Sequence, residues 1–104
     1  MVIAQACRRE LKKLPEAIRA DLVDAIARLE EGLGLTMPLS RPMPSIGKGV
    51  HELRLKDRSG AYRVVYALVT AGRVYVLHAF KKTTRVTPKS NVETARRRLR
   101  ELVR

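Results

Sequence analysis

The sequence predicts an α+β domain in which an N-terminal helical hairpin packs on a small antiparallel sheet and one further helix ends the chain. Three observations carry this prediction. Apolar residues recur at helical spacing through residues 14–34, period-two alternation marks three segments between residues 51 and 81, and a second helical stripe follows residue 87. A chain of 104 residues suits one compact domain, so we expect a single domain over residues 1–104.

The N-terminal third predicts two helices. Residues 5–13 suit a short helix, and residues 14–34 suit a longer one in which Pro15 fits a first-turn position. Gly32 and Gly34 end this helix. Its apolar stripe consists of Ile18, Leu22, Ala25, Ile26 and Leu29.

The remaining elements are a loop, three strands and a helix. Residues 35–49 hold three prolines and two glycines and are predicted to form a loop. The strands are expected at residues 51–56, 62–69 and 73–81, joined by "DRSG" and by a tight turn at Ala71-Gly72. The last helix lies within residues 87–104, where Ser90 and Glu93 are spaced as a capping box. Its apolar stripe consists of Val92, Ala95, Leu99 and Leu102.

The turn lengths predict the register of the strands. The expected cross-strand pairs are Lys56–Ala61, Arg54–Arg63, Arg63–Phe80, Val65–His78 and Val69–Val74. Alternation then gives a nearly apolar face that should pack on the helical hairpin, made of Leu53, Leu55, Tyr62, Val64, Tyr66, Leu68, Tyr75, Leu77 and Ala79. The opposite face has a charged end with Glu52, Arg54, Lys56, Arg63, Val65, His78, Phe80 and Lys82, and an apolar end with Val69, Val74 and Val76 that the last helix can cover.

The charge is the most informative feature of the composition. The net charge is +12, and residues 51–104 hold 14 Lys and Arg against 4 Asp and Glu, whereas residues 1–50 hold 8 against 6. All four aromatic residues also lie in the second half. Cations together with aromatic rings suit RNA, because phosphates meet the cations and bases can stack on the rings.

The charged end of the sheet is the candidate site. Like charges on neighbouring strands repel, so the placement of Arg54, Arg63 and Lys82 is a cost that phosphate binding would offset. We expect Arg63 to project from the open face and not from the core. His78 fits equally a core histidine satisfied by hydrogen bonds and an acid–base group whose proton is mobile at neutral pH. The run "ARRRLR" in the last helix is most simply a solvated face.

Other classes of site are not indicated. The second half of the chain has few acidic residues and no Cys/His cluster, and there is no glycine loop of the phosphate-binding types, so we expect neither a metal nor a cofactor. Cys7 is the only cysteine and is expected to pack in a helix. No apolar run is long enough to cross a membrane, and no signal peptide is evident, so the cytoplasm is the expected compartment.

The motifs "HELRLKDRSGAYRVVYAL" and "VYVLHAFKKTTRVTPKSNVETARRRLREL" resemble the RelE/HigB superfamily of toxins, in particular its phage-derived HigB-like branch. The resemblance covers about half of the chain, and "LPEAIRADLVDAIARLEEG" extends it to the helical hairpin. It implies the toxin of a type II toxin–antitoxin module, which cleaves mRNA in the ribosomal A site and is held inactive by an antitoxin, here expected to be a helix-turn-helix protein of the HigA type.

Residue by residue, the family's cationic strand positions fall on Arg54 and Arg63, and its basic positions at the end of the last strand fall on Lys81 and Lys82. His78 matches the histidine typical of this branch. We therefore predict a metal-free endoribonuclease with Arg54, Arg63, His78 and Lys82 as catalytic residues. The predicted RNA contacts are Lys56, Phe80, Lys81 and Arg85.

Two departures from the family pattern stand out. Members usually open with a full strand, where this chain has only "MVIA", and many carry a catalytic residue near the C-terminus, where this chain has Arg100 and Arg104. Two other readings stay open: an inhibitor of DNA gyrase like the ParE branch, and a non-catalytic RNA-binding module that binds in a salt-dependent way.

Overall fold

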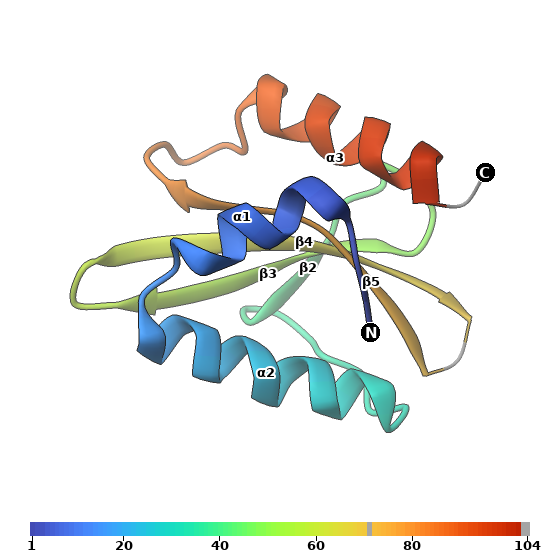
Figure 1. Ribbon diagram of the computed structural model, residues 1–104, viewed down its shortest axis with the longest axis horizontal. Coiled ribbons are helices and arrows are strands. Elements are labelled where there is room, and N and C mark those ends of the chain that lie inside the picture. The colour runs from blue at the N-terminus through green and yellow to red at the C-terminus, as the bar shows by residue number, and fades with distance from the viewer. Residues whose placement is uncertain (71, 103–104) are drawn as a thin grey trace.

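A five-stranded mixed sheet lies at the centre of the molecule, between α1 and α2 on one side and α3 on the other (Figure 1). The structure is a computed structural model that describes residues 1–70 and 72–102. The elements in chain order are β1 (Val2–Ile3), α1 (Gln5–Lys12), α2 (Glu16–Glu30), β2 (Ser40–Pro42), β3 (Val50–Asp57), β4 (Gly60–Thr70), β5 (Arg73–Lys82) and α3 (Lys89–Leu102). The α+β prediction with a helical hairpin and a C-terminal helix is confirmed.

The sheet has the order β1-β5-β4-β3-β2. The predicted antiparallel meander is confirmed as β3, β4 and β5, and it gains two short edge strands. β1 runs parallel to β5, and β2 runs antiparallel to β3. The prediction that residues 35–49 form only a loop is wrong for β2. A strand of two or three residues is too short to show alternation, so the sequence pattern gave no sign of either edge.

The register of β4 and β5 contains two irregularities that compensate each other. Val65 lies across from His78, as predicted, but Tyr66 lies across from Val76 and Leu68 from Val74. One extra residue therefore lies on β5 at Leu77 and one on β4 beyond Leu68. The pairing is shifted by one position between the bulges and is as predicted outside them. The predicted pairing of Val69 with Val74 is wrong, and Ala71 of the predicted turn lies outside the described residues.

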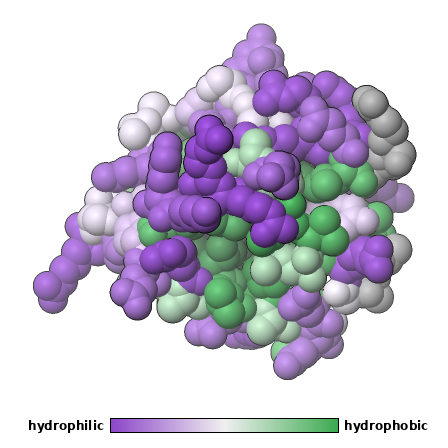
Figure 2. Space-filling model, in the orientation of Figure 1, coloured by the Kyte–Doolittle hydropathy of each residue, from purple (hydrophilic) through white to green (hydrophobic). Residues whose placement is uncertain are grey.

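Each face of the sheet has its own apolar core. The hairpin face, which packs on α1 and α2, includes Leu53, Leu55, Tyr62, Val64, Tyr66, Val74, Val76 and Ala79. The α3 face includes Val50, Val65, Ala67 and Leu77, with Tyr75 and Phe80 packed against them. The expected faces of Val74, Val76, Tyr75 and Leu77 are thus reversed, because these residues lie in or next to the shifted segment. Figure 2 shows hydrophilic residues gathered over α1 and hydrophobic ones in the region between α1 and α2.

The helices follow the predicted stripes. All five residues of the predicted α2 stripe are buried, and Val92, Ala95, Leu99 and Leu102 of α3 pack on the α3 face. The prediction of a capping box at Ser90 and Glu93 is wrong, because α3 already includes Lys89 and Ser90 lies inside its first turn. The Pro88 carbonyl instead accepts the amides of Asn91 and Val92, at 3.0 and 3.2 Å. No helix within the described residues is long and apolar enough to cross a membrane.

Candidate nucleic-acid interface

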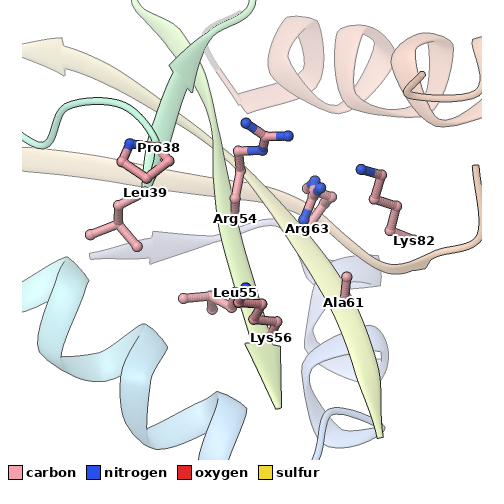
Figure 3. A pocket seen from close by; sticks show the side chains of 8 residues that line it. All are labelled: Pro38, Leu39, Arg54, Leu55, Lys56, Ala61, Arg63 and Lys82. Carbon is pink, nitrogen blue, oxygen red and sulfur yellow. The ribbon is translucent and has the colours of Figure 1, made fainter. Parts of the chain in front are cut away.

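The charged end of the α3 face is built from cross-strand rows of side chains. Lys56, Ala61 and Lys82 form the outermost row, and Arg54, Arg63 and Phe80 form the next. Residues two apart on a strand point to the same face, so both rows lie on one side of the sheet. Arg54, Arg63 and Lys82 extend from the same side of β3, β4 and β5 in Figure 3. The sequence-based pairs Lys56–Ala61, Arg54–Arg63 and Arg63–Phe80 are confirmed.

These rows enclose a pocket of about 510 Å³, which we call the basic pocket (Figure 3). Its lining consists of Pro38, Leu39, Arg54, Leu55, Lys56, Ala61, Arg63 and Lys82. Ala61 lies between two lysines in the outer row, so its small side chain leaves the space that a larger residue would fill. No carboxylate is among the lining residues. Four cations converge there, which is the chemistry expected of a site for phosphate.

Arg63 is the most buried cation of the basic pocket, with 6% of its surface exposed. The expectation that it projects from an open face is corrected, because its Nε lies 3.4 Å from Oε1 of the buried Glu52. Burial lowers the pKa of the Arg63 guanidinium, the negative charge of Glu52 opposes this, and the positive charge of Arg54 adds to it. Thr87 donates a hydrogen bond of 2.6 Å to Oε2 of Glu52. Glu52 therefore holds Arg63 in place at the base of the pocket.

Lys82 stands among other cations at the rim. Its pKa lies below the usual value of a lysine, because of desolvation and then because of the positive charges of Arg63, Arg54 and Arg85, with Glu52 opposing them. A lysine with a lowered pKa releases its proton more readily than a solvated one. Arg85, a predicted RNA contact between β5 and α3, contributes the smallest of these positive charges and is not among the lining residues of the basic pocket.

His78 belongs to a different cluster, which joins α1, β5 and α3. Its Nδ1 lies 2.9 Å from Oε1 of Glu10, and its Nε2 lies 2.6 Å from Oδ1 of Asn91. The same Glu10 oxygen accepts hydrogen bonds from Arg98 Nη1 at 2.7 Å and from the amide of Ala79 at 3.1 Å. His78 is 7% exposed and is not among the residues that line the basic pocket.

The other predicted RNA contacts are divided between the two faces. Phe80 lies on the α3 face beside Arg63 and stacks on His78, with 5.2 Å between ring centroids. Lys81 points to the other face, where its Nζ lies 6.0 Å from the centroid of the Tyr62 ring. Lys81 is thus not brought together with Arg54, Arg63 and Lys82, because neighbouring residues of a strand point to opposite faces.

A model of the phage-derived Gp49-like proteins (DUF891) matches residues 9–100, which is most of the chain. The chain belongs to the Gp49-like family. This family is RelE/HigB-like and is associated with toxins of toxin–antitoxin modules, which implies an antitoxin as partner. The five-stranded sheet with its helices fits a RelE-like fold. No curated protein was found to match the chain.

In this Gp49-like chain, sequence reasoning missed several residues of the site. Pro38 and Leu39 reach the basic pocket because β2 pairs with β3 and the amide of Arg54 donates to the Leu39 carbonyl at 2.7 Å. Glu10 lies 68 residues before His78, so no spacing could have joined them. Ala61 could have been predicted from the alternation of side chains along the strands, because it is a small residue between the cations of that face. Within the described residues, no group of His, Cys, Asp or Glu could hold a metal ion.

Proposed function

We propose that this protein is a toxin that cleaves mRNA on the ribosome as a metal-independent endoribonuclease. The observation that supports this most directly is the basic pocket, where Arg54, Lys56, Arg63 and Lys82 converge around a hollow without any carboxylate in its lining. The membership of the family adds the association with toxin–antitoxin modules.

The reaction that this pocket suits is attack of a ribose 2′-hydroxyl on the adjacent phosphate. The 2′-oxygen loses its proton and bonds to phosphorus, the bond from phosphorus to the 5′-oxygen breaks, and the 5′-oxygen takes up a proton. A 2′,3′-cyclic phosphate and a 5′-hydroxyl result. Extra negative charge develops on the phosphate oxygens, and we assign its stabilisation to Arg54 and Arg63, whose planar guanidinium groups can donate two parallel hydrogen bonds.

Lys82 is the proton donor to the leaving 5′-oxygen in this proposal. Its lowered pKa makes the ammonium a stronger acid than a solvated lysine, and its place beside Arg63 puts it at the same phosphate. Lys56 and Arg85 bind neighbouring phosphates, and Phe80 is the aromatic contact on the same face. Lys81 lies on the other face of the sheet, and we propose that it contacts a phosphate of the RNA outside the basic pocket.

His78 acts mainly through other residues. Both of its ring nitrogens have partners and its ring supports Phe80, so it positions the second row of the pocket. His78 would accept a proton from the 2′-hydroxyl only after giving up its contact with Glu10 or Asn91. With no strong base in the lining, the isolated enzyme is expected to be slow, and the ribosome supplies the attack geometry of the mRNA.

The basic pocket is also the surface through which we expect an antitoxin to inhibit the toxin. A cytoplasmic antitoxin, which we propose to be a helix-turn-helix protein of the HigA type, would block the toxin by covering the basic pocket or by preventing entry into the A site.

Expression of the wild-type protein and of Arg54→Gln and Lys82→Gln variants in a growing culture tests the proposal. The wild type should halt growth and translation and leave mRNA cut inside reading frames, while both variants should grow normally. Arg73→Gln, an exposed residue at the other end of β5, is the control of equal charge change and should remain toxic. DNA damage without cut mRNA would instead identify the protein as a gyrase inhibitor. Normal growth of cells that express the wild type would favour a non-catalytic RNA-binding module.

A further inference from the structure

One wall of the basic pocket is apolar, and phosphate chemistry does not need it. Pro38 and Leu39 lie at the edge of β3, with Arg54 between them and the cationic heads of Arg63 and Lys82 (Figure 3). They come from the segment that leads into β2, and the hydrogen bond from the amide of Arg54 to the Leu39 carbonyl fixes this segment on β3. We call these two residues the apolar wall.

Of the remaining lining residues, Leu55 adds apolar atoms near this wall, whereas Ala61 lies on β4 between Lys56 and Lys82. Ala61 has only a methyl group, Leu55 is 5% exposed, and the carbonyl of Leu39 is already used by Arg54. A ligand that fills the pocket must therefore carry negative charge at one end and a flat or apolar surface at the other. A volume of about 510 Å³ lies within the usual range for pockets that hold small ligands.

We infer that the basic pocket holds one whole nucleotide of single-stranded RNA, with its phosphate at Arg54, Arg63 and Lys82 and its base against Pro38 and Leu39. This inference rests on the proposed function and adds to it two residues, Pro38 and Leu39, that determine the affinity for the base. The base must leave any helix to reach the wall, so paired RNA is excluded.

The lining also determines how the base is recognised. Its side chains are cationic or apolar, and none offers an oxygen that could accept a hydrogen bond from the amino group of a base. Recognition then depends on the apolar area that the base covers. A purine should bind more tightly than a pyrimidine, and a pyrimidine more tightly than a sugar phosphate without a base.

Titration of the ¹⁵N-labelled protein with 5′-AMP, 5′-CMP and ribose 5-phosphate, followed by amide chemical shifts, tests this inference. We expect AMP to bind about tenfold more tightly than ribose 5-phosphate, which corresponds to about 1.4 kcal/mol, with CMP between them. Leu39→Ser should bring AMP to the level of ribose 5-phosphate and leave ribose 5-phosphate binding unchanged. Leu33→Ser, an exposed leucine outside the pocket, is the matched control and should behave as wild type.

Because Leu39 also packs against the core of the hairpin face, Pro38→Ser provides a second variant at an exposed position. It should reduce the preference for AMP by severalfold in a protein with unchanged amide shifts elsewhere. Equal binding of the three ligands to the wild type, or a preference that survives both wall variants, would overturn the inference. Absence of mRNA cleavage on ribosomes together with the expected order of nucleotide binding would overturn only the proposed function.

Discussion

Arg63 and Glu52 form a buried ion pair beneath the basic pocket, with 3.4 Å between Nε and Oε1 and with 6% and 2% of their surfaces exposed. Thr87 binds the second oxygen of the same carboxylate. The pair therefore links β3, β4 and the segment before α3. Removing one partner of such a pair leaves an uncompensated charge away from water, which costs more than the pair contributes.

The first prediction is that Glu52→Gln destabilises the protein by about 3 kcal/mol, since it leaves the Arg63 guanidinium buried without its counterion. Urea unfolding of the purified variant measures this. The double variant Glu52→Gln/Arg63→Met should recover most of the loss while remaining non-toxic, because the charge is then gone as well. Glu16→Gln, at an exposed position of α2, should unfold as wild type does. A single variant as stable as wild type would show that Arg63 is solvated.

Leu55 and Tyr66 test the hairpin face. Leu55 is 5% and Tyr66 1% exposed, and the Tyr66 hydroxyl lies 2.6 Å from Oγ of Ser40 on β2. Truncation of either residue to Ala should cost about 2–5 kcal/mol, because it leaves a cavity in a small core. Val23→Ala, at an exposed position of α2, should cost less than about 0.5 kcal/mol. If both core variants unfold at the wild-type urea concentration, the two faces of β3 and β4 are exchanged.

Ala61 determines the space in the basic pocket. Ala61→Leu adds three carbon atoms between Lys56 and Lys82, and the new side chain should occupy the place of the substrate phosphate. We expect loss of growth arrest in a folded protein, with binding of ribose 5-phosphate reduced at least tenfold. Ala17→Leu, at an exposed position of α2, should remain toxic. Toxicity of Ala61→Leu at the wild-type level would place the reaction outside this pocket.

The contacts of the Glu10 carboxylate predict that the stability of the protein depends on pH. Burial alone would raise the pKa of its carboxyl, but hydrogen bonds from Arg98, from the Ala79 amide and from His78 hold that pKa below its usual value. A carboxyl whose pKa is lower in the folded state contributes stability above its unfolded pKa of about 4.3 and loses it as the pH falls through the folded value.

Urea unfolding between about pH 6 and pH 3 should therefore show a steeper loss of stability toward acid for the wild type than for Glu10→Gln. The exposed residue Glu31 serves as control, and Glu31→Gln should follow the wild-type curve. Parallel curves for wild type and Glu10→Gln would mean that the contacts of Glu10 with Arg98 and His78 do not persist in solution.

The sequence predicted the charged rows correctly because the tight loop between β3 and β4 and the alternation of side chains determine them. Arg54 faces Arg63, and Arg63 faces Phe80, as the loop lengths require. The bulge at Leu77 has no sequence signal, because the second extra residue, on β4 beyond Leu68, restores the pairing at the ends of the strands. That bulge is why Tyr75 and Leu77 face α3.

The partners of buried polar groups could not be predicted, since they come from distant segments. His78 lies on the face that the alternation predicts, but its contacts with Glu10 and Asn91 depend on how α1 and α3 pack at the edge of the sheet. Pro38 and Leu39 enter the basic pocket through β2, a strand of three residues. Arg100 and Arg104 were the only residues expected near the usual C-terminal catalytic position. Arg100 is exposed on α3, and Arg104 lies outside the described residues.

The last prediction concerns the antitoxin, and it starts from the charge. The second half of the chain holds 14 Lys and Arg against 4 Asp and Glu, and four of these cations line one pocket. An antitoxin that covers this pocket must place carboxylates near Arg54 and Lys82, so electrostatic attraction should speed the encounter. Stopped-flow measurement of the association rate constant between about 0.05 and 0.5 M salt should show a fall of at least tenfold, and Lys82→Gln should lower the rate at low salt and flatten the dependence. The same charge change at Arg73, away from the pocket, should have a smaller effect. A rate constant that does not change with salt would mean that the antitoxin binds through apolar contacts and leaves the basic pocket uncovered.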